Sequence, residues 1–266
     1  MTALTWDPSR WITQTDVGRS RTCSDLEGLR RAVEAARTDK MERVLDIGCG
    51  FGGLAKLVGD YVGASEINGV DIDPRVVDEA ADKGVSVILQ DISRGALPFD
   101  DSYFDFTMSL GVWDYLEYFD GVIREISRIT RVGGTVLVSL PNLASWNNRL
   151  SLLAGYQPRD VEISNEILAG VPYRPYLKAG QRPAGHIHVP TLRAFVDLME
   201  YHGYETVSVL PGRPVVNTVS NKLVWAIDNA LSRRPSLARR FYYVGKHVRY
   251  TDKPERSPMM PYELLD

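Results

Sequence analysis

The stretch from Val44 to Gly53, VLDIGCGFGG, constrains this chain more than any other part of it. Aliphatic residues typical of a buried strand run directly into a loop that is more than half glycine. Glycine lacks a side chain and adopts positive φ angles at little cost, so such a loop can bring its backbone close to a ligand. The next residues have helical spacing, and a helix beginning there would direct its free N–H groups and positive dipole end toward the ligand. The stretch therefore predicts a site for a nucleotide-like molecule.

An aspartate inside this stretch narrows the choice of ligand. Gly48, Gly50 and Gly53 also fit the G-x-G-x-x-G spacing of dinucleotide-binding enzymes, so the glycines alone leave the ligand open. Asp46 lies at the carboxyl end of the predicted strand, where a buried carboxylate is costly without a cationic or hydrogen-bonding partner. A ligand that carries an ammonium group would provide this partner. The alternative is a plain strand-to-helix turn in which Asp and Gly serve only turn chemistry.

Length and composition favour one domain that acts on small molecules. A chain of 266 residues suffices for a single large α/β domain with an insertion. Its 31 basic and 34 acidic residues give no overall positive field, which argues against a nucleic-acid partner. Two cysteines, Cys23 and Cys49, are too few for a disulfide framework, and neither a signal peptide nor a membrane-spanning apolar run is visible. We expect a reduced, cytoplasmic protein.

Further acidic residues follow two more predicted strands. Residues 66–72 form a strand that closes on Asp71, where a carboxylate can accept hydrogen bonds from ribose hydroxyls. Asp73 precedes a proline and is better placed to cap the helix that begins there. Residues 85–89 form a short apolar strand that is followed by Asp91. This carboxylate either contacts the ligand or caps the next turn.

The D-x-G-x-G-x-G motif, with acids after the second and third strands, resembles the class I S-adenosylmethionine-dependent methyltransferases, in particular methyltransferase type 11 and the ubiquinone-biosynthesis-like group. The resemblance covers about residues 41–142. It implies a doubly wound, Rossmann-like α/β fold with a seven-stranded, mostly parallel sheet whose last strand is antiparallel, and S-adenosyl-L-methionine as cofactor. The cofactor-binding residues that it implies are Asp46, Gly48, Cys49, Gly50, Gly52, Asp71, Ile72, Asp91, Ile92 and Leu110.

The chain divides into parts of one methyltransferase domain, 1–266. We expect an N-terminal extension and helix over 1–40, the cofactor-binding core over 41–142, a substrate-lid insertion over 143–190, the rest of the core over 191–249 and a tail over 250–266. The first 20 residues are polar and are expected to be irregular. They either pack as a flap over the ligand site or, as we favour, cover a sheet edge. The aromatic and basic residues of the lid that are candidates to meet the acceptor are Trp146, Arg149, Tyr156, Arg159, Tyr173, Arg174, Tyr176, Lys178 and Arg182.

The core also contains a helix and a glycine pair before its fifth strand. Residues 121–130 have amphipathic helical spacing, and Gly133 and Gly134 are expected to end this helix. The fifth strand is then expected over 135–140.

Three residues are candidates for catalysis. In the resembling family, the segment after the fourth strand, here residues 111–119, lies beside the transferred methyl group. Asp114 and Tyr115 are therefore candidates to orient the acceptor, and packing as the first turn of a helix is the alternative. His186 and His188 alternate, so an extended backbone would place both rings on one side. His186 is the candidate base, and no metal site is predicted because no carboxylate or cysteine cluster accompanies the two histidines.

The sequence predicts an S-adenosylmethionine-dependent methyltransferase with a small-molecule acceptor, and it favours an oxygen on a metabolite or on a glycan- or lipid-linked intermediate. A non-catalytic S-adenosylmethionine-binding module and an NAD-dependent oxidoreductase are the alternatives, although the second gives no reason for Asp46 or Asp91. An amphipathic and basic segment, residues 221–249, is a candidate for peripheral membrane contact. The oligomeric state has no signal in the sequence.

Overall fold

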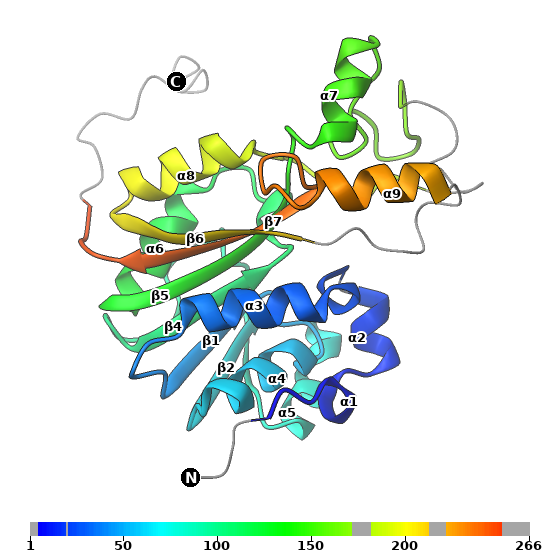
Figure 1. Ribbon diagram of the computed structural model, residues 1–266. Coiled ribbons are helices and arrows are strands. Elements are labelled where there is room, and N and C mark those ends of the chain that lie inside the picture. The colour runs from blue at the N-terminus through cyan, green and yellow to red at the C-terminus, as the bar shows by residue number, and fades with distance from the viewer. Residues whose placement is uncertain (1–4, 20, 172–181, 213–221, 252–266) are drawn as a thin grey trace, which may run out of the picture.

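The computed structural model describes residues 5–19, 21–171, 182–212 and 222–251, and it shows a seven-stranded sheet with helices on both faces (Figure 1). The strand order is β3-β2-β1-β4-β5-β7-β6. All neighbours from β3 to β5 run parallel, whereas β7 is antiparallel to both β5 and β6. The predicted doubly wound fold with an antiparallel last strand is confirmed. The strands are β1 (Arg43–Ile47), β2 (Glu66–Asp71), β3 (Ser86–Leu89), β4 (Phe104–Leu110), β5 (Thr130–Pro141), β6 (Tyr204–Pro211) and β7 (Arg240–His247).

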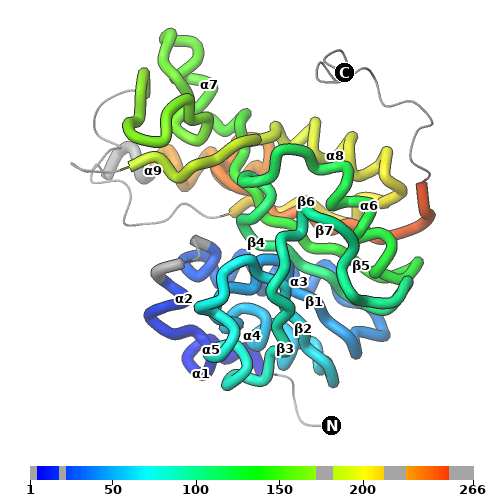
Figure 2. The backbone as a smooth tube through the Cα atoms, turned by 180° about the vertical axis from the view of Figure 1, so that it is seen from behind, coloured from blue at the N-terminus to red at the C-terminus, as the bar shows by residue number. Residues whose placement is uncertain are grey.

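Helices bury an apolar core against each face of the sheet. One face is covered by α3 (Leu26–Ala36), α4 (Gly53–Val62) and α5 (Val77–Asp82), the last entered through the short 3-10 turn η2 (Pro74–Val76). The other face is covered by α6 (Asp120–Ile129) and α8 (Leu192–Tyr201) (Figures 1 and 2). Because both faces are covered, every residue of β4 is buried. The predicted cap at Asp73 is confirmed, because its side chain accepts from the backbone of Arg75, and Thr191 caps α8 by accepting from the backbone of Ala194.

The N-terminal residues differ from the expectation. They form α1 (Pro8–Trp11), α2 (Gln14–Arg19) and the 3-10 turn η1 (Arg21–Ser24) instead of an irregular segment. These elements do not cover a sheet edge, because Asp16 hydrogen bonds to the start of α4 and lines the ligand cavity described below. A polar segment with few apolar residues gives no periodic signal, so its position depends on contacts with distant parts of the chain.

The junction between α6 and β5 was also predicted wrongly. The helix ends at Ile129, and Thr130 already belongs to β5, where it pairs with Phe104 of β4. The glycine pair therefore lies inside the strand, at a register shift, rather than at a helix end. A Cβ on Gly134 would lie 2.8 Å from the carbonyl oxygen of Asp105. The second glycine is needed because the neighbouring strand approaches closely there.

The segment predicted to be a lid begins with α7 (Trp146–Leu153), which lies beside α9 (Lys222–Leu231) beyond one end of the sheet (Figures 1 and 2). Trp146 is buried and its Nε1 donates to Asp228 Oδ1 at 2.6 Å, so this ring joins two helices and does not line the cavity. Tyr156 is half exposed and Arg149 donates to the backbone of Ala144. The candidates Tyr173, Arg174, Tyr176 and Lys178 lie outside the described residues.

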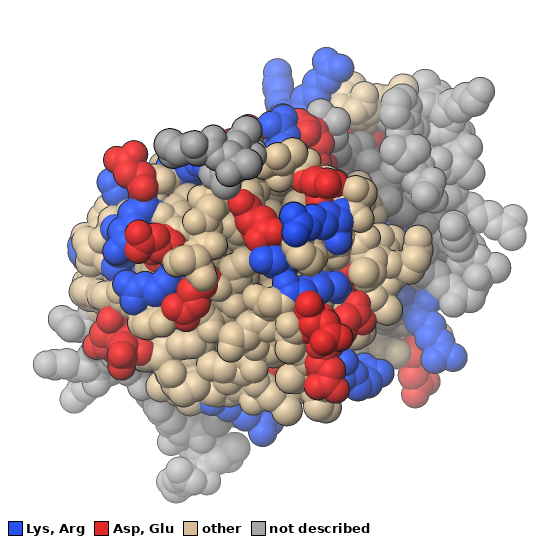
Figure 3. Space-filling model, turned by 90° about the horizontal axis from the view of Figure 1, so that it is seen from below, with Lys and Arg blue, Asp and Glu red and all other residues tan. Residues whose placement is uncertain are grey.

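Positive and negative side chains are interspersed on the face of the molecule seen in Figure 3. Such mixing leaves that face without the single-sign surface that a nucleic acid would need. Within the described parts of the chain, no helix is both long and apolar enough to cross a membrane.

Candidate functional site

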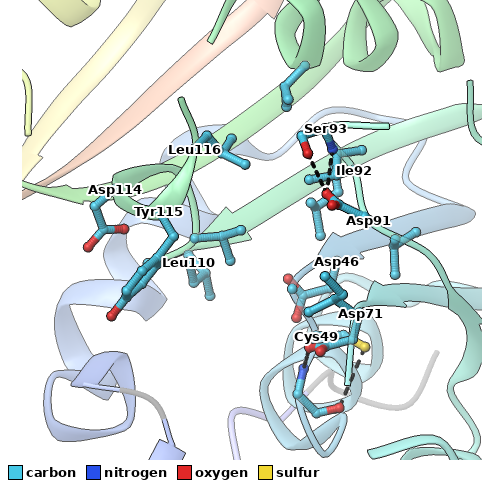
Figure 4. Close-up of a pocket in the computed structure, with 18 of the residues that line it drawn as sticks. Asp46, Cys49, Asp71, Asp91, Ile92, Ser93, Leu110, Asp114, Tyr115 and Leu116 are labelled. Atoms are coloured by element: carbon cyan, nitrogen blue, oxygen red, sulfur yellow. Dashed lines mark hydrogen bonds between the residues drawn. The ribbon is translucent and has the colours of Figure 1, made fainter. Parts of the chain in front are cut away.

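A cavity of about 910 Å³ opens at the carboxyl ends of β1, β2 and β4. The chain order of the strands reverses between β1 and β4, and ligands of doubly wound sheets bind at such a point. All of the predicted cofactor-binding residues line the cavity except Gly52, and so do Asp114, Tyr115 and His186. Figure 4 shows Asp46 and Asp71 on one side of it, Asp91 and Ile92 on another, and Asp114 with Tyr115 opposite these.

The glycine loop has a backbone that other residues could not adopt without strain. Gly48 has φ +75°, and a Cβ there would lie 2.1 Å from Val112 Cγ2. Its N–H donates to the carbonyl oxygen of Val70 at 2.7 Å, which ties the loop to β2. Gly52 has φ +78° and forms the left-handed N-cap of α4, which explains why it shapes the loop without reaching the cavity wall.

Two residues that the sequence analysis did not identify hold this loop. Asp16 Oδ1 accepts from the N–H of Gly53, one of the free donors at the start of α4. Lys83 Nζ donates to the carbonyl oxygen of Phe51 at 2.7 Å and pairs with Asp16 Oδ2 at 3.1 Å. The N-terminal segment and the residue that ends α5 therefore hold the loop through one ion-paired cluster. No local motif could have revealed these contacts, because the partners are far apart in the chain.

Asp46 is the most unusual carboxyl group in the cavity. It is 2% exposed, and its Oδ1 has no hydrogen-bond partner within the described structure. Burial, together with the negative charge of Asp71, raises the pKa of Asp46 well above its ordinary value. An unpaired buried carboxylate of this kind is stabilised by a cation, and the ammonium group of an amino acid would supply one.

We expect the Asp46→Asn variant to unfold at a higher temperature than the parent chain when no ligand is bound. A raised folded-state pKa of a carboxyl group means that its stabilising contribution is lost as the pH rises above the unfolded value of 3.8 and through the raised one. Asparagine avoids this cost, so the free energy of unfolding should increase by about 1–3 kcal/mol at neutral pH. Urea unfolding of both proteins at pH 5 and pH 8 measures it. A less stable variant at pH 8 would contradict this account of Asp46.

Backbone donors fix the orientation of Asp71. The N–H of Gly50 donates to Oδ2 at 2.8 Å and the N–H of Asp73 donates to Oδ1 at 3.0 Å. The carboxylate therefore couples the end of β2 to the glycine loop. Beside it, the apolar side chain of Ile72 is 66% exposed and lines the cavity. A carboxylate next to an exposed apolar side chain suits a nucleoside, because the carboxylate can bind the ribose hydroxyls and the apolar side chain can pack against the base.

Asp91 caps its own turn in the structure. Its Oδ1 accepts from the N–H of Ser93 at 2.9 Å and from Ser93 Oγ at 2.6 Å, and its Oδ2 pairs with Arg94 Nε at 3.2 Å. The Ser93 hydrogen bond is the main reason why the pKa of Asp91 is lowered. Asp91 and the neighbouring Ile92 both line the cavity, so a contact of Asp91 with the ligand stays a prediction.

The three candidate catalytic residues come together on one side of the cavity. Asp114 and Tyr115 belong to the 3-10 turn η3 (Trp113–Tyr115) that follows β4. His186 Nε2 lies 3.1 Å from Asp114 Oδ2, and the His186 and Tyr115 rings lie 5.4 Å apart. Both members of the His–Asp pair are buried, at 7% and 2% exposure of their side chains. The two chain segments are therefore joined by a contact between side chains.

The backbone around His186 is anchored on both sides. The carboxylate of Glu162 accepts from the N–H groups of Ala184, Gly185 and His186. The carbonyl oxygen of Asp114 accepts from the next two N–H groups, those of residues 187 and 188. Burial lowers the pKa of His186, but the hydrogen bond and charge of Asp114, with the charges of Asp160 and Glu162, outweigh it and raise the pKa above 6.5.

The two histidines do not share one environment as the alternation suggested. His188 is exposed, and its ring lies 6.2 Å from that of Tyr118 rather than in the cavity. Among the residues that the structure describes, no group of three or more His, Cys, Asp or Glu side chains is arranged to hold a metal ion.

The residues of the cavity fit S-adenosylmethionine. The unpartnered Asp46 oxygen matches the ammonium group of its amino acid end, and the oriented Asp71 carboxylate matches the hydroxyls of its ribose. The apolar side chains of Ile72 and Ile92 offer a surface for the adenine ring. These groups follow the elongated molecule from the glycine loop to the end of β3.

Comparisons with known proteins agree with this geometry. Residues 45–138 match the family model described as a methyltransferase domain. The chain is 30% identical over 120 residues to a demethylmenaquinone methyltransferase of Thermus thermophilus, which covers 43% of this chain and 54% of that protein. It is 26% identical over 175 residues to a chloroplastic tocopherol O-methyltransferase of Arabidopsis thaliana, covering 61% and 48%. The chain thus spans about half the length of these curated relatives.

Solved structures extend the likeness of the fold beyond the matched segment. A crystal structure of an S-adenosylmethionine-dependent methyltransferase from Mesorhizobium loti superposes with a TM-score of 0.56 at 16% identity and covers 82% of this chain and 97% of that one. The family match lies on β1 to β5, the part of the chain that carries Asp46, Asp71, Asp91 and Asp114. Within residues 45–138 the chain is therefore similar to a methyltransferase domain, and this likeness favours S-adenosylmethionine over NAD as the cofactor.

Proposed function

We propose that this protein transfers a methyl group from S-adenosylmethionine to an oxygen atom of a small-molecule acceptor, with His186 taking the acceptor's proton. The observation that carries the proposal is the buried Asp114–His186 pair, which borders the same cavity as Asp46 and Asp71. A base next to the donor site is what a hydroxyl acceptor requires, because a neutral hydroxyl is a weak nucleophile.

The partners of the imidazole indicate which of its nitrogens acts. Nε2 faces the carboxylate of Asp114 at 3.1 Å, so this nitrogen carries a proton and donates it. In the neutral ring the lone pair then lies on Nδ1, which is buried and has no hydrogen-bond partner among the described residues. Asp114 also stabilises the imidazolium that forms when Nδ1 takes up a proton. His186 is therefore set up to accept a proton rather than to donate one.

The rest of the site aligns and encloses the reactants. S-adenosylmethionine supplies a methyl group that its positive sulfur has already activated, so a weak base suffices. Asp71 fixes the position of the nucleoside, while Asp46 and the glycine loop hold the amino acid end. The wall opposite is formed by Tyr115, Leu116 and the segment anchored by Glu162. Together these residues orient the two reactants and exclude water from the site.

An acceptor with an apolar ring agrees with the rim of the cavity. Tyr115, Tyr118 and Ile187 line it and are about half exposed, at 45%, 50% and 53%. The two relatives are named for a menaquinone precursor and for tocopherol. We infer an acceptor that combines an apolar ring with a hydroxyl group, either a free metabolite or a glycan- or lipid-linked intermediate.

The protein is expected to form O-methyl products when it is incubated with S-adenosylmethionine carrying a ¹³C-methyl group and a panel of phenols, quinols and small-molecule extracts. The carbon chemical shift in NMR separates a methyl group on oxygen from one on nitrogen or carbon. A C-methyl product would contradict the oxygen target but not the methyltransferase. Binding of the donor without transfer to any pool would favour the non-catalytic module.

Peripheral membrane contact through residues 221–249 stays a prediction. Fewer basic side chains of this segment are available to a membrane than the sequence suggests. Arg239 Nε pairs with the buried Asp228 at 3.0 Å, and Arg240 lines the cavity. Two of the basic side chains in this segment are thus engaged inside the protein. The cytoplasmic location likewise stays an expectation.

A further inference from the structure

The cavity contains one cation that no described carboxylate neutralises. Its lining includes two arginines, Arg94 and Arg240, against six acidic residues, which are Asp16, Asp46, Asp71, Asp91, Asp114 and Glu117. Arg94 pairs with Asp91. Within the described residues Arg240 has no carboxylate partner, and its one side-chain hydrogen bond is a long one of 3.4 Å from Nη2 to the carbonyl oxygen of Ser139. A guanidinium has five N–H donors, so most of those of Arg240 are available to a ligand.

Arg240 and Asp46 project from the same face of the sheet. On β1, Asp46 lies two residues after Val44, and on β7, Arg240 lies two residues before Tyr242. Residues two apart in a strand point to the same face of the sheet. Val44 and Tyr242 belong to one apolar cluster, the one covered by α3 and α4. The carboxylate and the guanidinium therefore enter the cavity from the same side, although their strands are separated by β4 and β5.

The side chain of Arg240 crosses β5 and brings its charge close to β1. Its Nη2 lies 3.1 Å from the position that a Cβ on Gly111 would occupy. Gly111 directly follows β4, which is the neighbour of β1. Adjacent strands lie about 4.8 Å apart, so the guanidinium is displaced sideways from β1 by roughly one strand spacing. Met108 is the β4 partner of Asp46, and Gly111 lies three residues beyond it, which adds about 10 Å along the strand direction. An α-amino acid with an ammonium and a carboxylate on one carbon fits between two such partners.

From these positions we propose that Arg240 binds the α-carboxylate of S-adenosylmethionine, so that Asp46 and Arg240 together form a recognition site for its zwitterionic amino acid end. The assignment rests on the proposed function, because it takes this donor as the ligand. Arg240 lies outside residues 45–138, so the family match does not assign it. The acidic residues that line the cavity also explain why a cation is needed here. Without one, the carboxylate of the donor would be repelled by the charges of Asp46 and Asp71.

Isothermal titration calorimetry with three ligands tests this assignment. S-adenosylmethionine, its decarboxylated form and 5′-methylthioadenosine share the nucleoside, but the second lacks the carboxylate and the third lacks the whole amino acid end. We expect Arg240→Gln to weaken S-adenosylmethionine binding by about 10- to 100-fold, the typical loss for a charged hydrogen bond, and to leave the other two within about 2-fold. Arg240→Lys, which keeps the charge but not the planar fork, should lose less.

Arg94→Gln is the matched control, since it removes the other arginine of the cavity, and it should not discriminate between the donor and its decarboxylated form. Equal losses of Arg240→Gln for both forms, or no loss for either, would overturn the assignment while leaving the proposed function intact. Failure of the unaltered chain to bind S-adenosylmethionine would contradict both. Thermal unfolding of each variant confirms that the comparison is made between folded proteins.

Discussion

Replacement of His186 by alanine is expected to reduce the rate of methyl transfer by about 100- to 10,000-fold, the usual contribution of a positioned general base. Binding of S-adenosylmethionine should change by no more than about 2-fold, because the imidazole bonds to Asp114 and not to the glycine loop. Turnover with saturating acceptor and calorimetric titration of the donor measure the two quantities separately. An unchanged rate would remove His186 from the mechanism.

The pH dependence of the same reaction separates a base from a purely structural histidine. His186 must be neutral to accept a proton, so the rate should rise with pH through its pKa, which lies above 6.5. Asp114→Asn removes the hydrogen bond and the charge that raise this pKa. The rising limb should therefore move to lower pH in the variant while the maximal rate falls. If the rate rose over the same pH range in both proteins, a group other than His186 would be responsible for the pH dependence.

Replacement of Asp71 by alanine is expected to weaken binding of S-adenosylmethionine by about 100-fold or more. Hydrogen bonds from ribose hydroxyls to a carboxylate are each worth about 1.5–3 kcal/mol, and two of them are expected here. The variant also removes the acceptor for the Gly50 N–H, so the glycine loop loses its tie to β2 at this point. Titration calorimetry of the donor measures the loss.

Asp71→Asn is the matched control for that loss. An amide oxygen can still accept from Gly50, but it carries no charge, so an intermediate affinity is expected. The comparison with His186→Ala is the sharper test of the two roles. If both alanine variants lost the same donor affinity, the assignment of Asp71 to the donor and of His186 to the acceptor would be refuted.

The elements that the sequence predicted well are those with local signals. The strand, glycine loop and helix around Asp46, the cap at Asp73 and the antiparallel last strand are all present as expected. The predicted end of α6 was wrong. Thr130 could either extend the helix or pair with Phe104, and the neighbouring strand β4 favours the pairing. A turn glycine and a strand glycine look alike in a sequence.

The sequence by itself determined the fold class and the group of acids at the strand ends, because each depends on periodicity and on residue types at fixed spacing. Only the tertiary structure decided that Asp16 caps α4, that Asp114 contacts His186 and that Arg240 reaches Gly111. The physical reason is that each of these contacts joins segments far apart in the chain, where no spacing rule applies. Burial then gave Asp46 and His186 the shifted pKa values that their residue types alone do not specify.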